Sequence, residues 1–227
     1  MLSGFGREIG LVSFDLDDTL VDTFGSVPAR VRAALQAMRP RIAVDDEAID
    51  LIALDIASGN HELRNIRLIE AMALQTGDPL AAELLESFAG NTSLIRLIDG
   101  AIEVLEYLHG NAHLAVITNG FTTIQRRKIE HHRLDRFITT VVTSEAAMIA
   151  KPDLAIFQQA CSMSGIDPRH AVHIGDSPAT DVLGAKAAGF ATVLLRTSVP
   201  YISMDEEPEP DVEIERLTDL LQLLRTA

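Results

Sequence analysis

The stretch LVSFDLDDTL, residues 11–20, decides how the rest of the chain is interpreted. It begins with a short apolar run, Leu11 to Phe14, which is typical of a buried strand in a parallel sheet, and Asp15 and Asp17 follow at once. Two carboxylates about 4 Å apart would repel each other by roughly 4 kcal/mol at an effective dielectric constant of about 20. The pair therefore requires a cation or a shared proton, which makes this strand end a candidate site.

Other apolar runs repeat the pattern of the first one. They are Leu114 to Ile117, Ala171 to Ile174, Ala191 to Leu195 and a last short run, Val212 to Ile214. Helical patterns alternate with these runs over Ala101 to Leu108, Ala155 to Met163, Ala179 to Ala188 and Leu217 to Leu224. This alternation predicts an α/β fold with a doubly wound, Rossmann-like parallel sheet. In such sheets, ligand sites gather at the carboxyl ends of the strands.

The pattern changes between residues 21 and 99, where helical stretches occur without a convincing strand. The stretches are Ala29 to Met38, Glu47 to Ala57, Glu62 to Thr76 and Leu80 to Phe88. We predict an all-helical cap domain over residues 21–99, inserted into a catalytic core formed by residues 1–20 and 100–227. Because the insertion leaves after the first strand and returns before the second, we expect it to cover the crevice at the strand ends.

The composition and charge of the chain indicate which partners and which cellular location to expect. The 227 residues are 47% hydrophobic, which allows a sizeable core, and the formal net charge is −14. Nucleic acids and anionic membrane surfaces attract clustered Lys and Arg, so neither is an expected partner. The first ten residues lack the features of a secretory signal, and no apolar run approaches the roughly 18 residues of a membrane span. We expect a cytoplasmic protein, either a monomer or a homodimer.

The cysteine and histidine residues indicate no separate site. The single cysteine, Cys161, cannot form an internal disulfide and is expected to be buried in an apolar helix. The seven histidines show no zinc-site spacing, so we assign none of them to catalysis.

Polar residues at the other strand ends could bind a cation and a phosphate. Asp176 follows the run that ends at Ile174, and oxygen ligands gathered from such turns suit Mg²⁺. Four residues offer the hydroxyl, backbone N–H and ammonium groups that a phosphate needs: Thr118, Asn119, Gly120 and Lys151. Taken singly, each of these could belong to an ordinary turn or helix cap. Their positions at several strand ends favour one shared site.

Four motifs in this order resemble those of the haloacid dehalogenase-like hydrolases. They are Asp15-Leu16-Asp17-Asp18-Thr19, Thr118-Asn119-Gly120, Lys151-Pro152 and Gly175-Asp176-Ser177-Pro178-Ala179-Thr180-Asp181. Each short motif is weak by itself, but all four together, spread over nearly the whole chain, make a specific signal. The resemblance implies a Mg²⁺-dependent phosphatase of the branch with a helical cap.

The resemblance also implies a role for each matching residue. Asp15 attacks phosphorus and forms an aspartyl-phosphate, while Asp17 protonates the leaving oxygen and later deprotonates the hydrolytic water. The implied Mg²⁺ ligands are Asp15, the main-chain carbonyl of Asp17, and Asp176. The implied phosphate-binding residues are Thr118, Asn119, Gly120 and Lys151. Asp181 is expected to support this shell from behind.

Within the predicted cap, Arg64 and Arg67 are candidates for contact with a second anionic group of the substrate. The competing interpretation is that both arginines cover a solvated helix face. The expected substrate is a small phosphorylated metabolite, such as a nucleoside monophosphate, a sugar phosphate or phosphoglycolate.

Three other functions remain open at this stage. A 2-haloacid dehalogenase would use the same Asp15 nucleophile on carbon, but that reaction has no use for an acid at Asp17. A phosphomutase would transfer the phosphoryl group to a second hydroxyl in place of water. A non-catalytic binding module would be free to lose Asp17, Lys151 or Asp176, and all three are present.

Overall fold

The computed structural model describes residues 2–39, 45–57, 79–198 and 208–226. These residues form two compact units. The core unit comprises the described residues up to Val21, Leu97–Ser198 and the C-terminal segment, and the helical unit comprises those within Asp22–Arg96. The division falls within two short strands, β4 (Val21–Asp22) and β5 (Arg96–Leu97), which pair with each other.

A six-stranded parallel sheet forms the centre of the core unit. Its strands lie in the order β10-β9-β8-β3-β6-β7, and every neighbouring pair is parallel. The bounds are β3 (Leu11–Phe14), β6 (His113–Thr118), β7 (Thr140–Thr143), β8 (Ala171–Gly175), β9 (Ala191–Leu195) and β10 (Val212–Ile214). The sheet confirms the predicted α/β class and the Rossmann-like core.

The order of the strands reverses between β3 and β8. From β3 the chain continues to β6 and β7 on one side, whereas β8, β9 and β10 follow on the other. Phe14 of β3 pairs with Ile174 of β8 and with Val116 of β6, so the residue after Phe14 leaves the sheet between two neighbouring strand ends. Such a reversal is the usual place for a ligand in doubly wound sheets.

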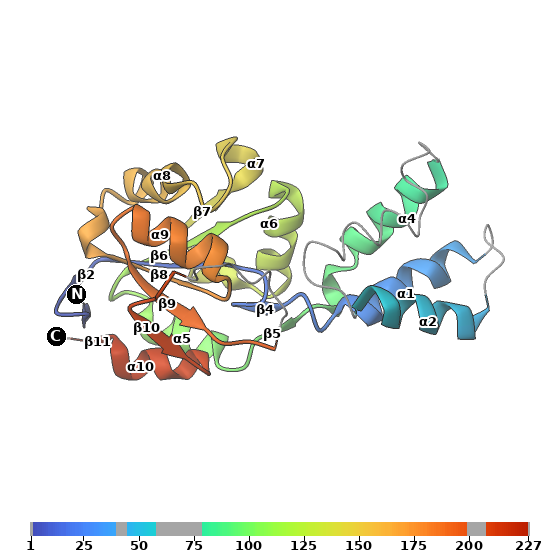
Figure 1. Cartoon of the computed structure of the whole chain (residues 1–227), viewed down its shortest axis with the longest axis horizontal. Coiled ribbons are helices and arrows are strands. Elements are labelled where there is room, and N and C mark those ends of the chain that lie inside the picture. The colour runs from blue at the N-terminus through green and yellow to red at the C-terminus, as the bar shows by residue number, and fades with distance from the viewer. Residues whose placement is uncertain (1, 40–44, 58–78, 199–207, 227) are drawn as a thin grey trace. The chain divides into compact units, whose positions relative to one another are not determined.

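Helices cover both faces of this sheet (Figure 1). The helices α8 (Leu154–Ser164) and α9 (Leu183–Ala187) lie on one face, and α5 (Ala101–Leu108) and α10 (Leu220–Leu223) lie on the other. The core unit also contains α6 (Thr122–His131), α7 (Ser144–Ala147) and the 3-10 turns Leu134–Arg136, Pro168–His170 and Leu217–Asp219. The helix expected over residues 179–188 is divided into a π-helical turn, Pro178–Val182, and α9.

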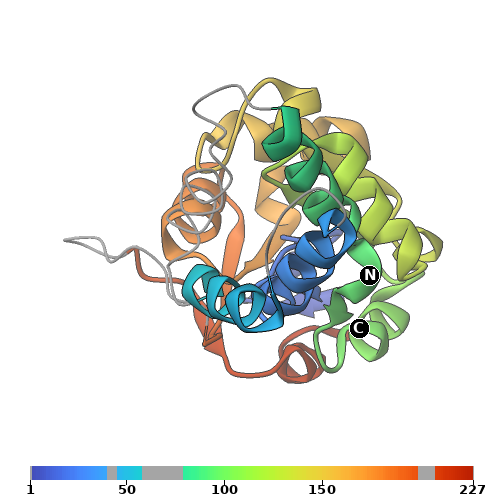
Figure 2. The ribbon, with the colours of Figure 1, turned by 90° about the vertical axis from the view of Figure 1, so that its right-hand side faces the viewer.

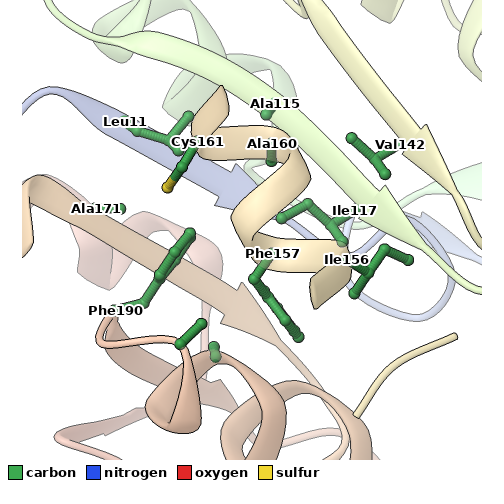
Figure 3. Close-up of a cluster of buried hydrophobic side chains, with 12 residues drawn as sticks. Leu11, Ala115, Ile117, Val142, Ile156, Phe157, Ala160, Cys161, Ala171 and Phe190 are labelled. Atoms are coloured by element: carbon green, nitrogen blue, oxygen red, sulfur yellow. The ribbon is translucent and has the colours of Figure 1, made fainter. Parts of the chain in front are cut away.

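Apolar side chains fill the space between the sheet and α8 (Figure 3). Phe157 of α8 is fully buried, and its ring packs edge-on against that of Phe190 with 5.7 Å between centroids. Cys161 belongs to the same cluster, which confirms the prediction of a buried thiol. Burial, reinforced by the charge of Asp167, raises the pKa of this thiol to about 11, so it stays protonated and inert.

Several short elements of the core unit differ from the prediction. β7 extends the sheet beyond β6, and its apolar pair lies between two threonines, a run too short to predict a strand. A small antiparallel sheet joins β1 (Leu2–Gly4), β2 (Arg7–Ile9) and β11 (Arg225–Thr226). Strands of two or three residues with charged side chains leave no alternating pattern in the sequence.

The helical unit contains α1 (Val27–Met38), α2 (Asp46–Ala57), α4 (Pro79–Gly90) and the 3-10 turn Thr92–Leu94. α1 packs against α2 and against α4 (Figure 2). Arg30 of α1 is buried, donates to the Phe88 carbonyl at 3.0 Å and lies over the Phe88 ring. The helix predicted over residues 62–76 lies outside the described residues. In the ranges that the structure describes, no helix has the length and apolar character that a membrane span requires.

Gly184 of α9 approaches α8 so closely that a methyl group would find no room. A Cβ there would lie 2.5 Å from Phe157 Cε2 and 2.6 Å from the Pro152 carbonyl oxygen. Gly184→Ala should lower the free energy of unfolding by about 1–3 kcal/mol in urea titrations, although alanine is the better helix former. Gly90→Ala, at the end of α4 with no atom within 4 Å of its Cβ position, is the control and should be neutral or stabilising. Equal responses of the two variants would contradict the tight packing.

Candidate active site

The loop after β3 is a tight turn that carries Asp15 and Asp17. The Asp15 N–H donates to the Ile174 carbonyl at 2.8 Å, which extends the pairing of β3 with β8. The Asp18 N–H donates to the Val21 carbonyl at 2.7 Å, and the φ of Asp18 is 59°, a left-handed conformation that aspartate tolerates better than most residues. The chain turns back at once, so both aspartates remain close to the strand end.

Lys151 is a buried ammonium group shared by two aspartates. Its Nζ lies 2.7 Å from Asp15 Oδ1 and 2.6 Å from Asp181 Oδ1. Burial alone would lower the pKa of Lys151, but the two carboxylates outweigh burial and raise the pKa above its usual value. The ammonium group therefore stays charged and offsets negative charge beside Asp15.

Asp181 accepts hydrogen bonds at both of its carboxylate oxygens. Oδ1 accepts from Lys151 and from His173 Nε2 at 3.2 Å, and Oδ2 accepts from the Ser177 N–H at 3.1 Å. Burial would raise the pKa of Asp181, but Lys151 and His173 outweigh it and hold the pKa well below its usual range. Asp181 is thus a permanent carboxylate with both oxygens engaged, which suits a residue that orients Lys151.

His173 of β8 contacts Asp181, although the sequence around His173 does not predict a role in the site. Burial lowers its pKa, so the imidazole is neutral near pH 7 and carries one N–H. Because Asp181 is ionised, Nε2 must hold that hydrogen, and Nδ1 then accepts from Ser13 Oγ at 2.9 Å. The ionised Asp181 therefore selects the tautomer, and the Ser13 hydroxyl, which also lies 3.2 Å from the Val172 carbonyl oxygen, supports the other side of the ring. The sequence signal for both residues is a polar side chain inside an apolar run.

Three carboxyl groups converge at the ends of β3 and β8. Asp15, Asp176 and Asp181 each place an oxygen within 4.8 Å of the others. Burial raises the pKa of Asp15 to about 7, against the opposing effect of Lys151. Burial, followed by Asp181 and Asp15, raises the pKa of Asp176 well above its usual value. Protons therefore compete for the oxygens of Asp15 and Asp176, and a set of hard oxygen donors of this kind fits Mg²⁺.

The turn after β6 is bonded to the loop that carries Lys151. Asn119 Oδ1 accepts from the Lys151 N–H at 2.9 Å, and Asn119 Nδ2 donates to the Lys151 carbonyl at 3.1 Å. This pair of bonds fixes the backbone that presents the ammonium group. The Gly120 N–H donates to Ser144 Oγ at 2.9 Å, and the buried Thr118 hydroxyl accepts from Gln125 Nε2 at 2.7 Å.

Two side chains of α6 hold Asp17, and the sequence did not predict either of them. Lys128 forms an ion pair with Asp17 Oδ1, and Gln125 Nε2 donates to Asp17 Oδ2 at 2.7 Å. The segment Thr122–His131 is almost wholly polar, so no apolar face predicts a helix there. That Gln125 and Lys128 lie on the same face of a helix could be inferred only after the helix had been located.

The residues of the four motifs lie together in the core unit. Hydrogen bonds and ion pairs link Lys151 to Asp15, Asp181 and Asn119, and Gln125 links Asp17 to Thr118. The carboxyl group of Asp176 lies beside that of Asp15. Arg64 and Arg67 lie outside the described residues.

The family model for the haloacid dehalogenase-like hydrolases matches residues 12–195. The chain belongs to this family. Glyceraldehyde 3-phosphate phosphatase from Methanothermobacter thermautotrophicus is 28% identical to this hydrolase over 93% of this chain and 96% of that protein. Phosphoglycolate phosphatase 1 from Pseudomonas aeruginosa is 29% identical over 93% of this chain and 78% of that protein.

The fold of this hydrolase is also found among solved structures. The HAD-hydrolase YfnB from Bacillus subtilis, solved bound to magnesium, has a TM-score of 0.71 at 22% identity, with 95% of this chain and 98% of that chain covered. At this identity the likeness supports the shared α/β architecture.

Removal of the Lys151 ammonium group should destabilise this hydrolase. Lys151→Met leaves Asp15 and Asp181 buried without their cation, so the free energy of unfolding should fall by about 3–5 kcal/mol at about pH 8. In the parent protein, the lowered pKa of Asp181 keeps it ionised in both folded and unfolded states above roughly pH 5, so its contribution is constant there. Asp15, whose pKa is about 7 in the parent, takes up a proton in both proteins as the pH falls. In the variant Asp181 has also lost its cation and takes up a further proton, so the deficit should shrink between about pH 8 and pH 5.

Urea unfolding followed by circular dichroism measures this effect. Arg196→Met, which breaks a half-exposed pair with Glu213, is the control and should cost less than about 1 kcal/mol at either pH. A deficit of Lys151→Met that matches the control, or that does not depend on pH, would contradict the assigned ion pairs.

Proposed function

We propose that this hydrolase is a Mg²⁺-dependent phosphatase that acts on small phosphorylated metabolites. The observation that carries the proposal is the arrangement at the end of β3, where Asp15 Oδ1 lies 2.7 Å from the Lys151 ammonium group and a second carboxylate, Asp17, follows two residues later. The two relatives named as phosphatases align with 93% of the chain and support the same activity.

Asp15 is the proposed nucleophile. Its carboxylate oxygen attacks phosphorus, the bond from phosphorus to the ester oxygen breaks, and the phosphoryl group is carried on Asp15. Water then attacks phosphorus, inorganic phosphate leaves and the Asp15 carboxylate is restored. Only the ionised form attacks, so a cation must counter the burial that raises the pKa of Asp15 to about 7.

Asp17 is the proposed acid and base. It gives a proton to the ester oxygen as that oxygen leaves, and it takes a proton from the water that attacks in the second step. A 2-haloacid dehalogenase would release halide, which needs no proton. The buried partners that hold Asp17 would have no use in that reaction, so the arrangement favours phosphoryl transfer.

Thr118, Asn119 and Lys151 are the proposed ligands of the phosphoryl oxygens. The Thr118 hydroxyl is at the end of β6, and the bonds from Asn119 hold the backbone of Lys151. Preorganised donors of this kind stabilise the charge of the transferring group without rearrangement. The Gly120 N–H is already bonded to Ser144, so we assign Gly120 to the shape of the turn.

The proposed Mg²⁺ ligands are Asp15, the Asp17 main-chain carbonyl, and Asp176. Bound there, the cation would balance the negative charge of the phosphoryl oxygens and of the nucleophile. Asp181 has both oxygens engaged by other donors, so its proposed role is to orient Lys151. Arg64 and Arg67 remain candidates for binding the rest of the substrate.

The activity itself is tested with para-nitrophenyl phosphate and a panel of phosphorylated metabolites. The parent protein should release phosphate in the presence of Mg²⁺. Asp15→Asn removes the nucleophile and should reduce kcat by more than about a thousandfold. Glu213→Gln, an exposed acid on β10, is the control and should behave like the parent. Full activity of Asp15→Asn, or chloride release from 2-chloropropionate without phosphatase activity, would refute the proposal.

Mg²⁺ affinity should increase with pH around neutrality. Protons on Asp15, whose pKa is raised to about 7, and on Asp176 compete with the cation, so binding must displace them. The affinity should rise by up to about tenfold per pH unit for each proton displaced, and this rise should level off above the raised pKa values. Isothermal titration in two buffers of different ionisation enthalpy measures both the affinity and the protons released. Affinity that does not change between about pH 6 and pH 8 would contradict this set of ligands.

A further inference from the structure

Both carboxylate oxygens of Asp17 are held by one helix, α6. Lys128 Nζ pairs with Oδ1, and Gln125 Nε2 donates to Oδ2 at 2.7 Å. An ionised carboxylate only accepts hydrogen bonds, so the nitrogen of the Gln125 amide must face it. The two donors are three residues apart and therefore project from the same face of the helix.

The burial of Lys128 distinguishes it from its neighbours on α6. Lys128 is 4% exposed and Gln125 is 2% exposed, whereas Arg126 and Arg127 are exposed. A lysine is almost never fully buried unless it is paired. The helix therefore turns this ammonium group toward Asp17, while the adjacent cations face solvent.

Gln125 also connects Asp17 to the turn after β6. The same Nε2 donates to Thr118 Oγ1 at 2.7 Å and has a longer contact of 3.3 Å with the Asn119 carbonyl oxygen. The two shortest bonds of the amide nitrogen are therefore those to the carboxylate and the hydroxyl. In the proposed function, Thr118 binds an oxygen of the phosphoryl group and Asp17 serves the ester oxygen of that group. Gln125 thereby sets the spacing between the two.

We propose that Gln125 and Lys128 are positioning residues that hold Asp17 for proton transfer. This inference rests on the proposed function, since it concerns Asp17 as the acid and base. Each carboxylate oxygen has two lone-pair sites, so the two donors leave sites for the proton that moves. Asp17 takes up this proton before the first step and gives it to the ester oxygen as the phosphorus–oxygen bond breaks. The attacking water returns a proton to Asp17 in the second step. Lys128 stabilises the negative charge that develops on Asp17 when the first proton leaves.

The test compares esters with good and poor leaving groups. Para-nitrophenolate leaves with little need for a proton, whereas the alkoxide of a simple alkyl phosphate needs one. Lys128→Met should lower kcat/KM on the alkyl ester by at least about tenfold and leave kcat/KM on the aryl ester nearly unaffected. This ratio reports the step that releases the alcohol and not the later hydrolysis of the aspartyl-phosphate, which both esters share. Lys128→Arg should restore most of the rate, because a guanidinium group also donates to Oδ1. The control is Arg127→Met at the adjacent exposed position, which should leave both rates unchanged.

Asp17→Asn separates failure of this inference from failure of the proposed function. It should lower kcat/KM on the alkyl ester by about 10²–10⁴-fold. Adding Lys128→Met to this variant should not widen the difference in kcat/KM between the two esters any further. If Asp17→Asn cleaves both esters like the parent, the proposed role of Asp17 fails. If Asp17→Asn is impaired on the alkyl ester while Lys128→Met lowers kcat/KM on both esters equally, or on neither, the positioning role is overturned and the function stands. Gln125→Met, which removes the donor at similar length, gives the same comparison if Lys128→Met does not fold.

Discussion

The ammonium group of Lys151, placed between Asp15 and Asp181, connects the parts of the site that come from distant segments of the chain. Burial makes every carboxylate at this strand end costly, and a cation in contact is what allows two of them to coexist there. The backbone of Lys151 is in turn fixed by Asn119, and Asp181 is fixed by His173. Both contacts therefore hold in place the ammonium group and the two carboxylates of Asp15 and Asp181.

Much of the core unit could be predicted because its central strands, β3, β8 and β9, are short, mostly apolar and buried throughout. The predicted bounds of β3, β9 and β10 agree with the structure, and α5 begins and ends where its pattern does. Motifs placed after such strands could be assigned to one edge of the sheet before any contact was known, because parallel strands share their carboxyl ends. The parallel arrangement of the strands is therefore sufficient to predict that the motif residues lie close to one another.

The parts that could not be predicted depend on pairing in space. Gln125 and Lys128 lie in a polar segment, where hydrophobic periodicity carries no information, and their partner is more than a hundred residues away. Ser13 and His173 occupy inward positions of β3 and β8 that are normally apolar, and only the register of those strands makes them neighbours. Long-range hydrogen bonds between side chains leave no local pattern.

The reversal of the strand order has a consequence for how the molecule is made. β3 ends at Phe14, yet one of its two partners in the sheet, β8, begins only at Ala171. The whole chain between β3 and β8 must emerge from the ribosome before β3 is paired on both sides, which is a topology of high contact order. Until then, Asp15 remains hydrated and the desolvation that raises its pKa does not yet act. The charged centre is therefore among the last features to form, after the strands around it have docked.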